Sequence, residues 1–88
     1  MPRYFFHILN SDREITPDWE GTELSGIESA REEAIASLRD IVAEALKSGG
    51  KVSGMGIQIA DEKGQYLDCI TAQDIVEEAV LKTGNGGS

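Results

Sequence analysis

A dense run of aromatic and β-branched residues at the start of the chain predicts a β-strand over residues 3–9. Asn10-Ser11-Asp12 follows it and has the composition of a turn. Residues 13–16 could return as a short strand, but Pro17 lacks an amide donor and therefore confines that strand to a sheet edge or ends it. Asp18-Trp19-Glu20-Gly21 then predicts a second turn.

An apolar stripe with three- and four-residue spacing predicts a long helix that begins near Ser25. The stripe consists of Ile27, Ala30, Ala34, Leu38, Ile41 and Ala45, flanked by Ile35, Val42 and Leu46. Ser25 and Glu28 have the spacing of a capping box, in which each side chain accepts the backbone amide of the other residue. Ser48-Gly49-Gly50 supplies the end of the helix, because glycine tolerates a left-handed cap.

Period-two alternation of apolar residues after the helix predicts a β-hairpin. Met55, Ile57 and Ile59 alternate with smaller or polar residues, and Asp61-Glu62-Lys63-Gly64 suits a three-residue loop with a bulge. The returning strand is expected at residues 65–70. Thr71 and Asp74 can then cap a short second helix. Its apolar stripe would be Ile75, Val76, Ala79 and Val80.

This order of elements places the chain in the α+β class, as one domain over residues 1–82 with a flexible tail at 83–88. We expect a small mixed or antiparallel sheet of three or four strands. The long helix should cover one face, and a short C-terminal helix should follow. A right-handed crossover through the long helix would set the first hairpin strand parallel to residues 3–9 and beside them. The short strand at residues 13–16 would then lie on the other side of residues 3–9, and the second hairpin strand would form the opposite edge of the sheet.

The charge balance narrows the classes of partner. The 88 residues include 8 Lys and Arg against 16 Asp and Glu, a formal net charge of −8, and the basic residues are scattered. Nucleic acid and anionic membranes are therefore disfavoured as partners, because both attract clustered basic residues. The charge favours a basic protein as partner, although an effect on solubility alone is the more common explanation. With no signal peptide, no membrane-spanning run and one cysteine, we expect a cytoplasmic protein.

His7 and Cys69 are the only histidine and the only cysteine, and they lack the partners that chemistry requires. A zinc site usually takes three or four Cys or His ligands. A nucleophilic Cys–His pair would form only if the first and last strands adjoined, and it would also need an oxyanion hole. We therefore predict structural roles, with Cys69 as a small buried hydrophobe and His7 as a partly buried strand residue.

Other motifs for chemistry are incomplete. The acidic residues between positions 10 and 23 lack the glycine and the distal glutamate of an EF-hand, so a solvated loop is favoured over weak divalent binding. Gly54-Met55-Gly56 is followed by Ile59 where a dinucleotide loop needs glycine, and Gly50-Lys51 is followed by Val52 where a Walker loop needs Ser or Thr. We predict no cofactor, no metal ion and no catalytic residue, and hence no enzyme.

The alternation of residues 3–9 raises the question of what covers the second face of the sheet. Tyr4, Phe6 and Ile8 should point to one side, and Phe5, His7 and Leu9 to the other. One long helix covers only one face, so we expect a homodimer across the other, with the second helix folding over it as the rival. The predicted interaction surface consists of Phe5, His7, Leu9 and Trp19. For Trp19 itself, folding back as a lid over the core is favoured over exposure.

Three segments together resemble a known family. They are Met1-Pro2-Arg3-Tyr4-Phe5-Phe6-His7-Ile8, the step Asp18-Trp19-Glu20-Gly21-Thr22-Glu23-Leu24 with Ala30-Arg31-Glu32-Glu33-Ala34 on the helix, and Ile57-Gln58-Ile59-Ala60-Asp61-Glu62-Lys63-Gly64. They closely resemble a family of short bacterial proteins catalogued as a domain of unknown function, over about residues 1–70. The resemblance implies no activity.

A fainter similarity is to HicB-like antitoxins, in which a strand pair also ends in a Pro-Asp…Gly step before an Ala-rich acidic helix. Here the step is Pro17-Asp18 with Gly21, and the helix runs from Glu28 to Ala34. This similarity implies an acidic partner for a small basic toxin, without operator binding. The sequence therefore favours a small non-catalytic interaction module, with an antitoxin-like or accessory partner of a small basic protein as the alternative.

Overall fold

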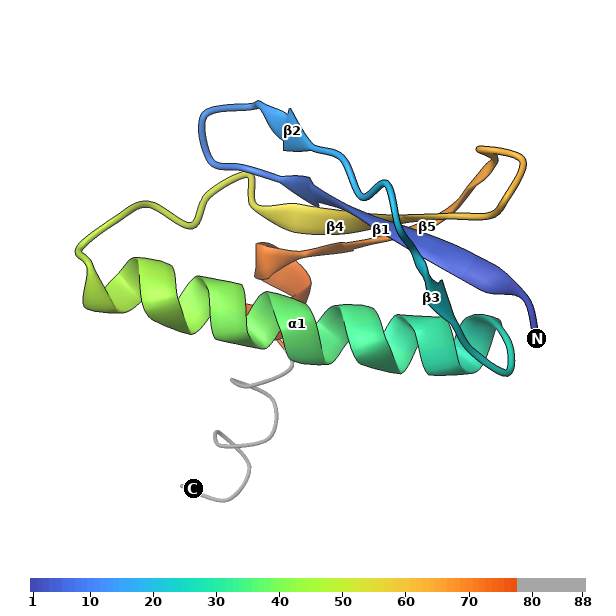
Figure 1. Cartoon of the computed structure of the whole chain (residues 1–88). Coiled ribbons are helices and arrows are strands. Elements are labelled where there is room, and N and C mark those ends of the chain that lie inside the picture. The colour runs from blue at the N-terminus through green and yellow to red at the C-terminus, as the bar shows by residue number, and fades with distance from the viewer. Residues whose placement is uncertain (78–88) are drawn as a thin grey trace, which may run out of the picture.

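The chain folds into an antiparallel sheet with a long helix across one of its faces (Figure 1). The computed structural model describes residues 1–77. The elements are β1 (Arg3–Leu9), β2 (Ile15–Thr16), β3 (Thr22–Glu23), α1 (Ile27–Lys47), β4 (Gly56–Ala60) and β5 (Tyr66–Thr71). A short helix follows β5 at residues 72–77. This arrangement confirms the α+β class. The predicted positions of Ala79 and Val80 and the predicted tail at 83–88 lie outside the described residues.

The strand order in the sheet is β2-β1-β4-β5, with β3 paired to the beginning of β1. This order matches the expectation, but the parallel crossover was wrong, because β1 pairs antiparallel with β4. The reason lies between β1 and the helix. β2 and β3 carry the chain back along β1, so that Glu23 pairs with Arg3 before the helix begins. The helix then returns to the far end of β1, and β4 starts beside Leu9 and runs the opposite way.

The core lies between α1 and the face of the sheet that carries Tyr4. On the helix, burial follows steps of four residues through Ala30, Ala34, Leu38 and Val42. On the sheet, the buried side chains are Tyr4, Ile57, Ile59 and Ile70, and Phe6 and Ile8 pack against them. Both ends of the predicted stripe are exposed, because Ile27 and Leu46 lie in the first and last turns of the helix. The sheet therefore contacts mainly the middle of α1.

The two ends of α1 differ in how well the sequence predicted them. The capping box was wrong: Gly26 is the N-cap residue, no side chain caps it, and the Ser25 hydroxyl lies 2.8 Å from that of Ser29. At the other end the glycine stop is confirmed. Gly49 has a φ of +74°, and the amide of Gly50 donates to the carbonyl of Ala45 at 2.8 Å.

The hairpin between β4 and β5 follows the sequence prediction. Gly64 has a φ of +79°, and its amide donates to the carbonyl of Asp61 at 3.0 Å. The cap of the following helix is also confirmed. The amide of Thr71 donates to the Asp74 carboxylate at 3.0 Å, and the amide of Asp74 donates to the Thr71 hydroxyl at 3.2 Å.

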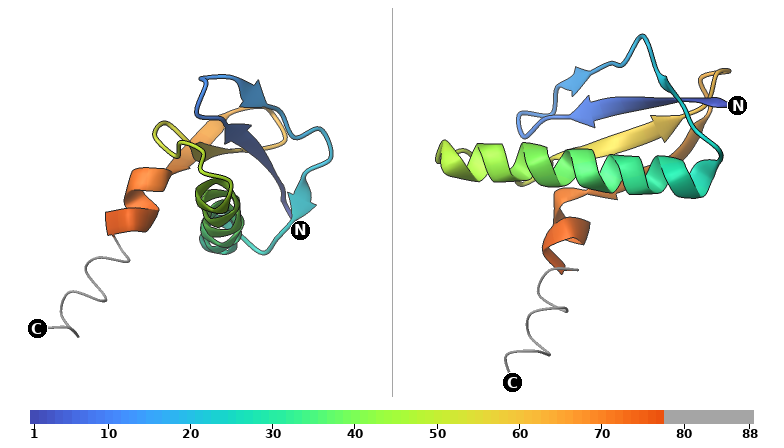
Figure 2. Two further views of the ribbon diagram at one scale, coloured as in Figure 1. Left: turned by 90° about the vertical axis from the view of Figure 1, so that its left-hand side faces the viewer. Right: turned by 60° about the horizontal axis from the view of Figure 1, so that its bottom comes forward.

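Both helical segments lie on one side of the sheet, as the left view of Figure 2 shows. Ala72 is buried in the core, and Ile75 packs against it. Within residues 1–77, the second helix therefore does not fold over the opposite face. No helix in this part of the chain combines the length and the apolarity needed to cross a bilayer.

Candidate functional site

The face of the sheet that α1 leaves uncovered, here called the open face, is built by alternate residues of four strands. The strand register places ten residues there: Ile15, Leu9, Gly56 and Thr71 in one row, His7, Gln58 and Cys69 in the next, and Phe5, Ala60 and Tyr66 in the third. Gly56 and Ala60 are buried between larger neighbours. Ile15 and Tyr66 remain 54% and 63% exposed. The open face is thus apolar at its two outer strands and closely packed in the middle.

The open face carries no formal charge when His7 is neutral. Of the 8 Lys and Arg and 16 Asp and Glu residues in the chain, none belongs to the ten residues of this face. Asp68 lies on the helix side of β5, where it forms an ion pair with Arg31 of α1. In the part of the chain that the structure describes, the charged residues thus lie on the two helices, in the loops and at strand positions outside the open face.

Asp18 fixes the turn between β2 and β3 to the edge of β1. β2 pairs with Ile8 and Leu9 and β3 pairs with Arg3 and Tyr4, which leaves residues 5–7 of β1 without a strand partner on that edge. The Asp18 carboxylate fills this gap, because its Oδ2 accepts the amide of Phe6 at 3.0 Å.

The same carboxylate also closes the turn. Asp18 Oδ1 accepts the amides of Glu20 at 3.2 Å and Gly21 at 3.1 Å. Partial burial of the carboxyl raises its pKa, but the amides of Phe6, Gly21 and Glu20 and the nearby His7 outweigh this effect, so the pKa of Asp18 is lowered. The ionised form is therefore the one that holds the turn.

His7 and Gly21 complete this contact. The amide of Asp18 donates to His7 Nδ1 at 3.0 Å, so a neutral His7 carries its proton on Nε2. Gly21 has a φ of +72°, and a Cβ there would lie 2.8 Å from Phe5 Cε2 and 2.9 Å from the carbonyl oxygen of Tyr4. Only glycine fits this approach without movement of β1.

Trp19 projects from the turn that Asp18 holds. It is 84% exposed, so the expectation that it folds back over the core was wrong. The physical reason is local. The backbone on both sides of Trp19 is fixed by the hydrogen bonds of Asp18, and Gly21 already occupies the space against Phe5. The structure thus places Trp19 on a turn beside β1, whereas Phe5, His7 and Leu9 lie on the open face.

His7 and Cys69 share a row of the open face but do not meet. Gln58 of β4 lies between them, and two strand spacings separate their backbones by about 9.5 Å. The condition for a nucleophilic pair, adjoining first and last strands, is not fulfilled. Burial, and to a lesser degree the nearby Asp74, raises the pKa of the Cys69 thiol, which disfavours the reactive thiolate.

Three of the acidic residues before the helix, Asp12, Asp18 and Glu23, accept hydrogen bonds through their carboxylates. Asp12 Oδ1 accepts the amide of Glu14 at 3.0 Å, and Glu23 pairs with the Arg3 guanidinium at 2.8 Å. Within residues 1–77, no group of three or more His, Cys, Asp or Glu side chains is arranged to hold a metal ion. The predicted solvated loop agrees with this geometry.

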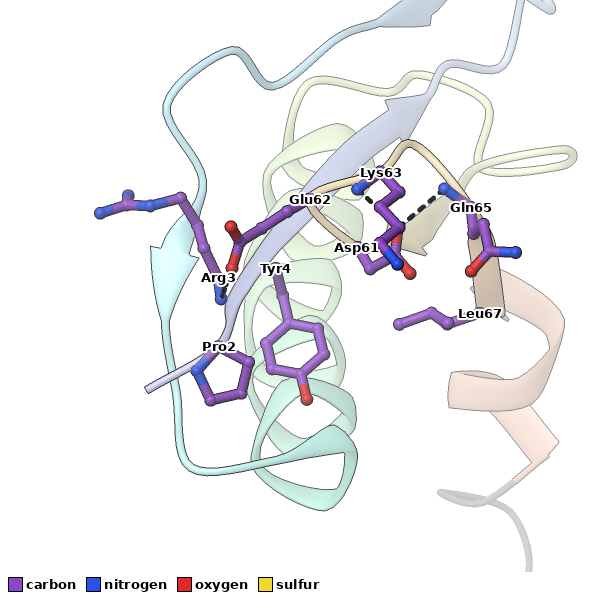
Figure 3. A pocket seen from close by; sticks show the side chains of 8 residues that line it. All are labelled: Pro2, Arg3, Tyr4, Asp61, Glu62, Lys63, Gln65 and Leu67. Carbon is purple, nitrogen blue, oxygen red and sulfur yellow. Dashed lines mark hydrogen bonds between the residues drawn. The ribbon is translucent and has the colours of Figure 1, made fainter.

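A hollow of about 660 Å³ lies between the start of β1 and the hairpin tip (Figure 3). Two of its carboxylates form hydrogen bonds with backbone amides. Asp61 Oδ1 accepts the amides of Lys63 and Gln65, both at 2.9 Å, and Glu62 accepts the amide of Arg3 at 3.2 Å. In these contacts the carboxylates accept backbone amides and thereby shape the hairpin tip.

A second hollow of about 430 Å³ separates the loop before β4 from the short helix at 72–77. Its lining has no titratable side chain: Val52, Ser53, Gly54, Met55, Thr71, Ala72, Gln73 and Val76. It therefore offers no group for acid–base chemistry.

Side chains of the chain itself partly block the outer edge of β5, so that a further strand cannot easily pair there. The amide of Ala72 donates to Met55 of the neighbouring chain segment, so by alternation the amides of Cys69 and Thr71 point outward. Each already has a partner, because Asp68 Oδ1 accepts the amide of Cys69 at 2.8 Å and Asp74 accepts that of Thr71. Side chains that occupy edge amides oppose edge-to-edge pairing.

Comparison with known proteins gives one match. A family model described as a domain of unknown function, DUF6894, matches residues 3–73, which include the turn of Asp18 and the whole sheet. No curated protein and no solved structure matches the chain. The resemblance to a family of unknown function is thereby confirmed, whereas the similarity to HicB-like antitoxins is not shown.

Proposed function

The chain belongs to DUF6894, a family of domains of unknown function, and from its surface we propose that it is a non-catalytic interaction module that pairs with a second copy of itself. The observation that supports this proposal is the open face: ten residues without charge on a chain with a net charge of −8. We assign the module to the cytoplasm, which agrees with its single free thiol.

A second copy fits the open face for an electrostatic reason. In a two-fold dimer both copies contribute the same patch, so carboxylates on that patch would bring negative charge from both sides unless basic residues of the patch paired with them. A neutral patch lets a chain this acidic self-associate without that repulsion. The exposed side chains of Ile15 and Tyr66 and the half-buried Phe5 and Leu9 provide the apolar area.

The arrangement of the sheet also favours face-to-face pairing over edge-to-edge pairing. At one edge, β2 is only two residues long. At the other edge, the side chains of Asp68 and Asp74 occupy the outward amides of β5. Short strands and occupied amides are both features that prevent a sheet from growing at its edges.

Light scattering of the full chain at micromolar concentration tests the proposal. We expect about twice the chain mass of 9.5 kDa for the parent. Ile15→Glu should give a soluble monomer, because Ile15 is exposed and its substitution removes no core contact. Phe5→Glu should also dissociate the dimer. Leu46→Glu is the matched control, since Leu46 is 60% exposed on the far end of α1 and should leave the dimer intact.

Two results would contradict the proposal. One is a mass of a single chain for the parent throughout the micromolar range. The other is a dimer that Ile15→Glu and Phe5→Glu leave unchanged while Leu46→Glu dissociates it, since the contact would then use the helix face.

A further inference from the structure

Trp19 is the most exposed large hydrophobic side chain of the described residues, and the turn that carries it is fixed. The amide before the indole is held by His7 Nδ1, and the two amides after it are held by Asp18 Oδ1. A rigid turn loses little conformational entropy when its side chain is bound. Exposed Trp residues on preorganised segments are typical anchors of protein contacts.

The charges beside Trp19 indicate what kind of group the indole would meet. Asp18 and Glu20 flank it in the chain, and Glu20 is exposed. The nearest basic residue in contact with the turn, Arg3, is already engaged, because its guanidinium donates to the carbonyl oxygen of Glu20 at 2.8 Å and pairs with Glu23. The turn therefore presents an aromatic face within a negative environment.

A second copy of the chain does not fit this turn well. It would bring a net charge of −8 toward carboxylates of the same sign, without the neutral surface that the open face provides. A cation, in contrast, gains both from the ring of Trp19 and from the neighbouring carboxylates. Arginine suits the position better than lysine, because its planar guanidinium stacks on an indole and can pair with a carboxylate at the same time.

We propose that the turn of residues 17–21, called here the Trp19 turn, docks an arginine-bearing basic segment of a partner protein. The guanidinium stacks on the indole of Trp19, and the carboxylate of Glu20 pairs with it. The contact does not require the sheet dimer, since none of its residues is among the ten of the open face. Failure of one proposal therefore leaves the other standing.

Trp19 is the only tryptophan of the chain, so its fluorescence reports on this turn alone. The full chain is titrated at low salt with a short synthetic peptide of alternating Arg and Ser, with the Lys counterpart and with the Glu counterpart. We expect a saturable change of emission with the Arg peptide, a weaker one with the Lys peptide and none with the Glu peptide.

Variants separate stacking from general attraction by charge, with binding followed through the anisotropy of a labelled Arg peptide. Trp19→Ala should weaken binding between about threefold and thirtyfold. Glu20→Gln should weaken it more than Glu32→Gln, which removes the same charge from an exposed site on α1. Tyr66→Ala removes an exposed aromatic ring from the open face and should leave the affinity for the Arg peptide unchanged.

Three outcomes would overturn the proposal. The first is an affinity for the Arg peptide that Trp19→Ala does not change. The second is an equal loss of affinity for the Arg peptide in Glu20→Gln and Glu32→Gln, because the attraction would then come from net charge only. The third is a Trp19 emission that shifts with the concentration of the protein alone in the parent and not in Ile15→Glu, because a second copy would then cover the indole.

Discussion

Asp18 connects three parts of the chain through its own atoms. Its carboxylate replaces a strand on the open edge of β1, its Oδ1 closes the turn that carries Trp19, and its amide orients His7. Three amides depend on one ionised side chain. At the residue scale, the order of the turn that carries Trp19 therefore depends on this carboxylate.

Asp18→Asn should destabilise the fold by about 1–3 kcal/mol at neutral pH, since amides that donated to a charged acceptor lose it. The pKa of Asp18 is lowered in the folded chain, so its stabilising effect is complete above the unfolded pKa of about 3.9 and is lost as the pH falls through the folded value. Urea unfolding of both proteins at several pH values measures this. The difference in unfolding free energy should shrink on acidification, and a constant difference from neutral pH to below pH 3 or so would show that the charge does not matter.

Gly21→Ala should destabilise the chain more than Gly64→Ala. Both glycines have a positive φ, so both substitutions force an L-residue into a conformation that costs about 1 kcal/mol. At Gly64 nothing lies within 4 Å of the new Cβ, whereas at Gly21 it would collide with Phe5, Arg3 and the Tyr4 carbonyl. Thermal unfolding of the two variants compares them directly. Equal melting temperatures would mean that β1 moves away from the turn without loss.

At the scale of elements, the fully buried contact of α1 with the core follows one line of residues, and Ile35 and Ile41 pack beside it. The helix presents two alanines, one leucine and one valine at four-residue steps to β4 and its neighbours. Leu38 is the largest of these side chains and is 0% exposed. The stability of the fold should therefore depend strongly on this single residue.

Leu38→Ala should cost about 2–5 kcal/mol of unfolding free energy, because it leaves a cavity at the centre of the core. Leu46→Ala is the matched control, since the same atoms are removed from a side chain exposed in the last helical turn. Its effect should be less than about 0.5 kcal/mol. Circular dichroism during urea unfolding gives both values. A parent-like stability of Leu38→Ala would contradict the packing of α1 described above.

The elements that the sequence predicted correctly depend on local signals. The stripe of α1, the glycine stop after it, the hairpin loop at Gly64 and the cap at Thr71 and Asp74 are all set by residues within a few positions. The predicted direction of β4 was wrong because that direction depends on β3. This strand has only two residues, and it is defined by its pairing with Arg3 and Tyr4 rather than by a sequence pattern.

The site was predicted less completely, for a similar reason. The sequence indicated a turn at Asp18 and proposed Phe5, His7, Leu9 and Trp19 as a surface. It could not show that Asp18 accepts the amide of Phe6, because that contact spans 12 residues of sequence. Without this contact, nothing indicated that Trp19 would be held outward. Whether these four residues bind a partner stays a prediction.

At the scale of the whole molecule, charge and apolar surface are separated. Within residues 1–77, the carboxylates lie on the helices, in the loops and at strand positions outside the open face, while the ten residues of that face have none. This separation underlies both proposals, with a neutral face for a second copy and an acidic turn with Trp19 for a basic segment. The hollows at the hairpin tip and beside the short helix take no part in either.

Cys69 lies in the middle row of the open face and gives the most direct test of the central claim, that this face is the contact between two copies. The measurement is the rate at which the Cys69 thiol reacts with an excess of a disulfide reagent, over a range of protein concentrations. Because the pKa of this thiol is raised, the reaction is followed at roughly pH 8.5, where enough thiolate forms. The account predicts that the rate falls as the parent associates and stays high at every concentration in Ile15→Glu. A rate that is independent of concentration, and equal in the parent and in Ile15→Glu, would contradict it.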